Sequence, residues 1–270
     1  MTHSLPVRRL LLVSSLGLLT ALGGASAARS QTPEEKGLTI ARDAREKARG
    51  FGNFTARQTM VLRNKQGQES KRQVRIKVLE VPGDGDKSLF VFDQPRDVKG
   101  TAFLVHAKKD KADDQWLFLP ALKRVKRISS SNRSGSFMGS EFAYEDMGAQ
   151  EVERFTYKYL RDEPCGEATC TVVERFPLEK RSGYRRQVVW QDKDELRVRQ
   201  IHFFDRKNAH LKTLTLTEYR QYLDRYWQAG VMTMINHLTG KSTVLTWSDF
   251  KYRTKLNERD FTRTGLKRAR

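Results

Sequence analysis

Alternation of apolar and polar side chains with a period of two residues runs through most of the chain and constrains its fold more than any other feature. In residues 54–64, Phe54, Ala56, Met60 and Leu62 share one face, and the side chains between them are mostly threonine and arginine. This period is that of a β-strand with one buried face. Similar runs cover residues 73–78, 87–95, 100–109, 114–120, 155–160, 169–176, 183–191, 196–204, 210–220, 226–237 and 241–253. Because the turns between them are short, the pattern predicts antiparallel neighbours in chain order.

One helix precedes the strands. Thr32 can cap it, Pro33 suits its first position, and Glu35 completes a capping box, so we predict a helix from there to about Arg49, with Gly50 ending it. A second helix at residues 147–154 has weaker sequence support. We therefore predict a mainly β (α+β) fold, in which about eleven antiparallel strands form an incomplete barrel, or a strongly curved sheet, around a helical plug.

Two details sharpen this prediction. Residues 89–92 and 116–119 are apolar on both faces, which is typical of strands covered on both sides, here by the N-terminal helix and a second layer. Leu196 and Val198 share a parity that Ile201 and Phe203 break, so a β-bulge is expected near Arg199.

The first residues predict export. Arg8 and Arg9 precede a short apolar run, and Ala25-Ser26-Ala27 matches a signal peptidase site, so residues 1–27 indicate a cleavable signal peptide and a periplasmic mature protein. In such an oxidising compartment Cys165 and Cys170 are expected to form a disulfide at the tip of a hairpin.

The net charge of +19 points to a polyanionic partner. For an exported protein the candidates are phospholipid headgroups, an acidic envelope polymer or an acidic protein surface, and nucleic acid is not expected. A solvated surface of scattered charge is the alternative, because lysine and arginine occur in nearly every strand.

Function is expected to concentrate in residues 116–147, which begin as a strand, continue through a basic run and end in a Ser/Gly-rich loop. The basic run forms a predicted basic rim for a headgroup or an acidic partner, or else protects an edge strand from pairing: its residues are Lys123, Arg124, Lys126 and Arg127. The loop, residues 129–147, carries large apolar side chains that must cover either the core or a ligand, and we regard it as a candidate gate.

The chain has more large apolar side chains than a simple core needs, which favours an apolar cavity for acyl chains. The candidate lining residues are Phe90, Phe92, Phe103, Trp116, Phe118, Phe137, Met138, Phe142, Tyr144, Met232, Met234 and Trp247.

Enzymatic signatures are sparse. The five histidines have no partner at metal-ligand spacing, and the serine-rich stretch at 129–136 matches neither a nucleophile elbow nor a P-loop. No enzyme activity, cofactor or metal is predicted, and an envelope hydrolase is kept only as an unfavoured alternative.

Two segments, WLFLPALKRVKRIS at 116–129 and GSFMGSEFAYEDM at 135–147, resemble signature blocks of the periplasmic outer membrane lipoprotein-sorting family, in its uncharacterised LolA-like subgroup. The resemblance extends to the segment from DQP to KGTAFL (residues 93–104) and to DFTRTGL at 260–266.

This resemblance implies a LolA/LolB-like incomplete barrel with an apolar cavity. The implied function is that of a carrier that shuttles a lipid or lipoprotein towards the outer membrane, with transient membrane contact and without covalent chemistry. The resemblance also implies work beside an RND-type transporter. The expected organisation is a signal peptide (1–27), one lipid-binding domain (28–266) and a basic tail (267–270). The alternative function is a basic envelope protein that binds an anionic polymer or an acidic partner without lipid.

Overall fold

The chain forms fifteen strands in a computed structural model, which describes residues 1–3 and 31–269. The predicted signal peptide lies outside the described residues apart from its first three. The strands are β1 Asn53–Arg63, β2 Glu69–Leu79, β3 Lys87–Gln94, β4 Ala102–His106, β5 Asp114–Leu119, β6 Arg124–Arg127, β7 Phe155–Cys165, β8 Ala168–Pro177, β9 Tyr184–Asp192, β10 Val198–Asp205, β11 His210–Thr217, β12 Arg220–Tyr222, β13 Tyr226–Gln228, β14 Val231–Asn236 and β15 Ser242–Tyr252.

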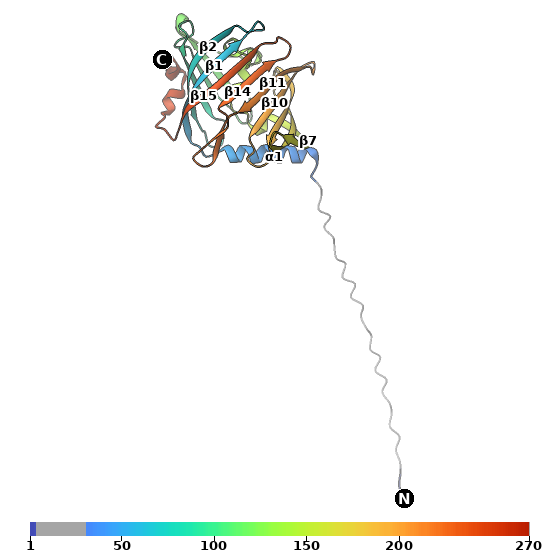
Figure 1. Cartoon of the computed structure of the whole chain (residues 1–270). Coiled ribbons are helices and arrows are strands. Elements are labelled where there is room, and N and C mark those ends of the chain that lie inside the picture. The colour runs from blue at the N-terminus through green and yellow to red at the C-terminus, as the bar shows by residue number, and fades with distance from the viewer. Residues whose placement is uncertain (4–30, 270) are drawn as a thin grey trace. The chain divides into compact units, whose positions relative to one another are not determined.

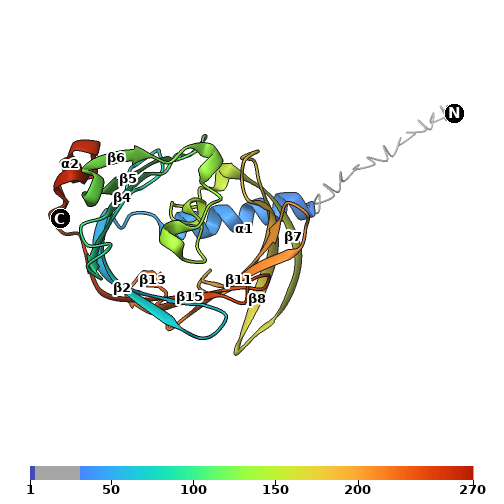
Figure 2. The same cartoon turned by 90° about the horizontal axis from the view of Figure 1, so that it is seen from above.

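Thirteen strands form one antiparallel sheet in the order β6-β5-β4-β3-β2-β1-β15-β14-β11-β10-β9-β8-β7, and β12 and β13 form a separate ribbon. The sheet curves around its inner face (Figure 2). Its edge strands β6 and β7 do not pair in the described residues, so the sheet is not closed into a barrel. The predicted mainly β architecture is confirmed. The sheet has thirteen strands where about eleven were predicted: the twelve alternating runs each supply one, and the thirteenth is β6, whose basic residues show no apolar alternation.

Helix α1 (Pro33–Ala48) begins with the predicted capping box: the Thr32 hydroxyl accepts a hydrogen bond from the Glu35 backbone N–H at 3.1 Å, and the Thr32 N–H donates to the Glu35 carboxylate at 2.9 Å. The helix crosses one end of the curved sheet (Figure 1). We call this the helix end and the opposite end of the strands the far end. Apolar residues of α1, among them Leu38 and Ile40, pack against Tyr157 of β7.

Close approach of α1 to β7 depends on Gly37, the one buried residue of the helix. A Cβ at this position would lie 2.8 Å from the backbone nitrogen of Tyr159. We therefore expect Gly37→Ala to lower the free energy of unfolding, although alanine favours a helix over glycine by about 1 kcal/mol. Thr39→Ala, on the exposed side of α1, is the control and should be neutral or slightly stabilising in urea denaturation. A more stable Gly37→Ala protein would contradict the close packing.

The outer face of β3 to β5 is covered by the end of the chain. The 3-10 turn η6 (Glu258–Phe261) and helix α2 (Arg263–Arg268) place Phe261 and Leu266 against Leu89 and Leu104, and all four side chains are buried. The predicted two-sided cover of these strands is therefore correct, but the outer layer is this C-terminal segment and not α1. Residues 147–154 contain the 3-10 turn η5 (Val152–Arg154) in place of the second α-helix considered above.

Two local predictions are confirmed. A disulfide joins Cys165 at the end of β7 to Cys170 of β8, with a Cα–Cα distance of 5.7 Å, and so closes the tip of that hairpin. The register of β10 against β9 shifts between Val198 and Gln200, where the parity of the sequence predicted a bulge.

None of the helices in the described part of the chain is long and apolar enough to cross a membrane.

Candidate functional site

The central loop (residues 129–147) lies inside the curved sheet (Figure 2) and forms part of its core. Phe137 is 1% exposed. Its ring centroid lies 5.0 to 6.1 Å from the rings of Phe90, Phe92, Phe103 and Tyr144. The sequence left two roles open for these apolar residues, covering the core or covering a ligand. The structure places them against the protein's own core.

Most of the predicted lining residues lie in this same inner cluster. Six of them are buried there: Phe90, Phe92, Phe103, Phe137, Phe142 and Met234. Four more pack against it with partial exposure: Met138, Tyr144, Met232 and Trp247. These ten residues therefore belong to one apolar cluster on the inner face of the sheet.

Trp116 and Phe118 do not belong to that cluster. Both lie on the outer face of β5, beneath the C-terminal segment, while Leu117 between them points to the inner core. The prediction that these two residues line an inner cavity is therefore wrong. The cause is the two-sided burial of β5, which removes the polar residues that would mark the outer face.

Polar contacts attach the central loop to strands on several sides of the sheet. The ammonium of Lys212 donates to the Glu141 carbonyl at 2.8 Å, and the Tyr184 hydroxyl donates to the Asp146 carboxylate at 2.9 Å. The Glu145 carboxylate accepts from the Ser182 hydroxyl at 2.6 Å. Such buried networks hold a segment in one arrangement when their members are satisfied. The loop is thus fixed by hydrogen bonds as well as by packing.

Burial raises the pKa of Glu145 above its usual value of 4.5, and the nearby charge of Asp146 raises it further. A carboxyl whose pKa is higher in the folded protein than in the unfolded chain binds more protons when folded, so stability falls as pH rises through that folded-state pKa. We expect the stability of the wild type, relative to Glu145→Gln, to increase as pH is lowered from 7 to about 4.5. Urea denaturation of both proteins across this range measures it. A constant difference would show that Glu145 titrates normally.

A mainly apolar cavity lies at the helix end, between α1, the start of β10 and the β12–β13 ribbon, and has a volume of about 300 Å³. Val198, Leu216 and Met232 line it from β10, β11 and β14, and Phe51 and Trp227 line it from outside the large sheet. A volume of this order is at the lower end of the range for small-molecule pockets. The cavity therefore has room for part of an apolar ligand.

Charged side chains surround the entrance to this cavity. Lys47 and Glu195 form an ion pair at 2.7 Å, and the Trp227 indole N–H donates to the same carboxylate at 3.0 Å. The hydrogen bond from Lys47, followed by that from Trp227, lowers the pKa of Glu195. Arg197 lies over the Trp227 ring at 4.6 Å, and Arg225 also lines the cavity. Glu195 pairs with Lys47, and the buried Asp192 pairs with Arg197 at 2.8 Å. Arg225 forms no ion pair within the described residues and is the cation of this set that is best placed to meet an anionic group.

Local sequence explains how the helix end is built. α1 ends before Gly50, whose φ of +89° turns the chain, and the Glu80 carboxylate accepts hydrogen bonds from the Gly50 and Gly52 backbone N–H groups at 2.7 Å. This places Phe51 beside the rings of Phe54 and Tyr226, with centroids 5.6 and 6.4 Å away. The aromatic cluster anchors the ribbon that covers the cavity.

Sequence reasoning found only one residue of this cavity, Met232. It missed Val198 and Leu216, although both follow the apolar alternation of their strands. The alternation showed that both side chains face inwards. It did not show which end of the strand lines a cavity, because that depends on the connections at that end. The β12–β13 ribbon, which comes from residues 218–230, was not predicted as a separate element.

The predicted basic rim lies on β6 and the turn before it, at one edge of the sheet. Lys123, Arg124, Lys126 and Arg127 are all exposed, and Arg127 pairs with Asp114 at 2.5 Å. None of these four residues lines the helix-end cavity. Their place on an edge strand agrees with the alternative that they prevent pairing with other sheets. No group of His, Cys, Asp or Glu side chains in the described residues is placed to hold a metal ion.

Comparison with known proteins identifies the family. A family model described as an uncharacterized protein matches residues 84–268. The chain is similar to an outer membrane lipoprotein-sorting protein domain from Vibrio parahaemolyticus, with 54% identity over 87% of this chain and 99% of that one and a TM-score of 0.85. It is also similar to a DUF1329 family protein from Desulfovibrio piger, with 28% identity, 87% and 100% coverage and a TM-score of 0.82.

A LolA superfamily protein from Nitrosomonas europaea has the same fold, with a TM-score of 0.68 at 19% identity over 87% of this chain and 100% of that one. No curated protein matches the chain. The resemblance seen in residues 116–129 and 135–147 is confirmed by these relatives. The chain belongs to the family of outer membrane lipoprotein-sorting protein domains and has a LolA-like fold.

Proposed function

We propose that this protein is a periplasmic carrier that holds acyl chains of a lipid or lipoprotein in the helix-end cavity and shuttles them towards the outer membrane. The observation that carries the proposal is the cavity itself, an apolar space of about 300 Å³ with a charged entrance, in a domain of the lipoprotein-sorting family. The apolar lining would receive the chain, and Arg225 at the entrance would meet an anionic headgroup.

The energetics are sufficient without a covalent step. Each buried methylene contributes about 0.8 kcal/mol, so ten methylenes contribute about 8 kcal/mol, which corresponds to a Kd of about 1 μM before ordering costs. Methionine and leucine side chains such as Met232 and Leu216 adapt to chains of different length. Reversible binding of this strength suits a carrier, which must also release its cargo.

Titration with cis-parinaric acid, a fluorescent fatty acid, tests the proposal. We expect saturable binding with a micromolar Kd and displacement by palmitate. Absence of saturable binding to protein from which bound lipid has been removed would reject the acyl-chain carrier. The periplasmic location and an RND-type transporter partner rest on the sequence and the family resemblance, and both remain predictions.

A further inference from the structure

The far end of the sheet differs from the rest of the molecule in its charge. The six connections at this end lie at residues 64–68, 95–101, 120–123, 178–183, 206–209 and 237–241. They carry one exposed acid, Asp97. Their exposed bases are Lys65, Arg96, Lys99, Lys123, Lys180, Arg181, Arg206, Lys207 and Lys241. None of these nine bases forms an ion pair within the described residues.

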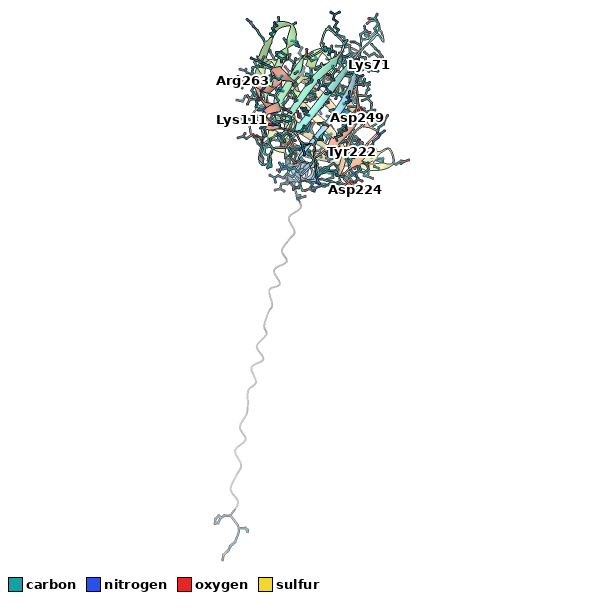
Figure 3. All side chains as sticks on the ribbon, turned by 90° about the vertical axis from the view of Figure 1, so that its left-hand side faces the viewer. Lys71, Lys111, Tyr222, Asp224, Asp249 and Arg263 are labelled. Atoms are coloured by element: carbon teal, nitrogen blue, oxygen red, sulfur yellow. A yellow bond between two sulfur atoms is a disulfide. The ribbon has the colours of Figure 1, made fainter. Side chains whose placement is uncertain are left out.

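The helix end has no such excess. Its five connections between strands, at residues 80–86, 107–113, 166–167, 193–197 and 218–230, carry both signs. Their exposed acids are Asp110, Glu167, Asp194, Glu218 and Asp224, and their exposed bases are Lys111, Lys193, Arg220 and Arg225. In Figure 3, Lys71 marks the far end and Asp224 the helix end. The positive charge is therefore directional, although lysine and arginine are spread along the whole sequence.

Exposed apolar side chains gather at the same far end. Leu122, Leu178 and Leu238 lie in three of its connections and are 63%, 58% and 62% exposed. Ile235, near the end of β14, is 43% exposed, whereas the helix end has one comparable residue, Leu223. Each of the three leucines is followed within three residues by an exposed lysine. We call these three leucines and the nine bases the far-end surface.

The three leucines come from different parts of the sheet. Leu122 follows β5 near one edge, Leu178 follows β8 near the other edge, and Leu238 follows β14 in the middle. Because the sheet is curved (Figure 2), three such positions surround its far end and do not lie in one line. A partner that contacts all three must therefore span this end of the sheet.

We propose that the far-end surface docks on an anionic lipid bilayer, with the three leucines inserted at the interface and the bases against the headgroups. Basic residues beside exposed apolar side chains are the combination that holds peripheral proteins at such surfaces. A soluble polyanion would engage the bases but give the leucines no apolar environment. Docking of this kind rests on the proposed carrier function for its purpose and deepens it by naming the membrane-facing side.

Docking in this way would give the carrier a defined orientation. The helix-end cavity and the far-end surface lie at opposite ends of the strands. A protein held by its far end would therefore present the cavity entrance away from that bilayer. Cargo would be exchanged with a partner on the side remote from the membrane, while the far end keeps the carrier at the surface.

Co-sedimentation of the protein with vesicles tests the inference, using phosphatidylglycerol and phosphatidylethanolamine in one set and phosphatidylcholine alone in the other. We expect binding to the anionic set that weakens strongly between 0.1 and 1 M salt, where the screening length falls from about 10 to about 3 Å. The triple variant Leu122→Ser/Leu178→Ser/Leu238→Ser should bind at least about a hundredfold more weakly, since loss of one inserted leucine costs about tenfold. Leu223→Ser, at the helix end, should bind as the wild type does.

The charge contribution has its own matched pair. Lys123→Gln/Arg181→Gln/Lys241→Gln should lose most binding to anionic vesicles, whereas Lys251→Gln/Arg253→Gln/Lys255→Gln, which removes the same three charges from exposed positions outside the far-end surface, should retain it. Wild-type affinity for anionic vesicles in the triple leucine variant would overturn the proposal. It would also be overturned if the wild type and the triple leucine variant both bound soluble polyphosphate as tightly as anionic vesicles, because that would indicate a polyanion site.

Cavity binding separates this inference from the proposed function. The triple leucine variant should bind cis-parinaric acid with the wild-type affinity, which shows that it is folded and that its cavity is intact. Vesicle binding that depends on the leucines, in a protein that takes up no fatty acid, would support docking while rejecting the carrier. Fatty acid binding in a wild-type protein that does not bind anionic vesicles would support the carrier function and reject docking.

Discussion

The Phe137→Ala variant should unfold with a free energy about 3 to 5 kcal/mol lower than that of the wild type, the usual cost of removing a fully buried phenylalanine side chain. Phe137 meets four aromatic rings at the centre of the inner core, and the surrounding strands cannot collapse into the space that the ring leaves. Urea denaturation followed by tryptophan fluorescence measures the change. Leu122→Ala, at an exposed position, is the control and should change stability by less than about 0.5 kcal/mol.

This variant also decides what the central loop does. A loop that serves as a packed part of the core loses stability on truncation of Phe137. A gate would respond differently: Phe137→Ser and Phe142→Ser would alter the rates of fatty acid uptake and release with little change in the free energy of unfolding. The hydrogen bonds of Lys212 and Tyr184 to the loop favour the first outcome. A stability change below about 1 kcal/mol in Phe137→Ala would contradict a core role for the loop.

Leu216→Trp should weaken fatty acid binding by more than about a hundredfold. Leu216 lines the helix-end cavity next to Met232, with which it is directly paired across strands β11 and β14. A larger ring there would exclude part of the ligand, and exclusion of about four methylenes costs about 3 kcal/mol. Titration with cis-parinaric acid measures the loss.

The control for that variant is Leu178→Trp, which makes the same substitution in an exposed connection at the far end. It should leave fatty acid affinity unchanged. Circular dichroism and the urea midpoint of both variants establish that each is folded. Unchanged affinity in a folded Leu216→Trp protein would place the ligand elsewhere, and the inner cluster around Phe103 would be the next site to test.

Much of the fold follows from local rules. The capping box of Thr32 and Glu35 begins α1, the alternation of residues 54–63 fixes the inner face of β1, and the parity change at Arg199 marks the bulge in β10. Each of these depends on neighbours in the sequence. The same is true of the Cys165–Cys170 disulfide, because both residues lie at one hairpin tip.

What could not be predicted depends on contacts between distant segments. Trp116 and Phe118 look like cavity walls until the C-terminal helix α2 is seen to cover them. Phe137 looks equally suited to a core or a ligand, and only its position among four rings decides between them. The actual cavity is formed where α1, the start of β10 and the β12–β13 ribbon meet, a junction of three segments far apart in the chain.

Mass spectrometry of lipid extracted from the gently purified protein tests the proposed acyl-chain site most directly, with Leu216→Trp purified in parallel. We predict that wild-type protein carries lipid or fatty acid in a defined stoichiometry and that the Leu216→Trp protein carries almost none. Wild-type protein that is free of lipid when purified from several expression hosts, or equal amounts of lipid in both proteins, would contradict an acyl-chain site in the helix-end cavity.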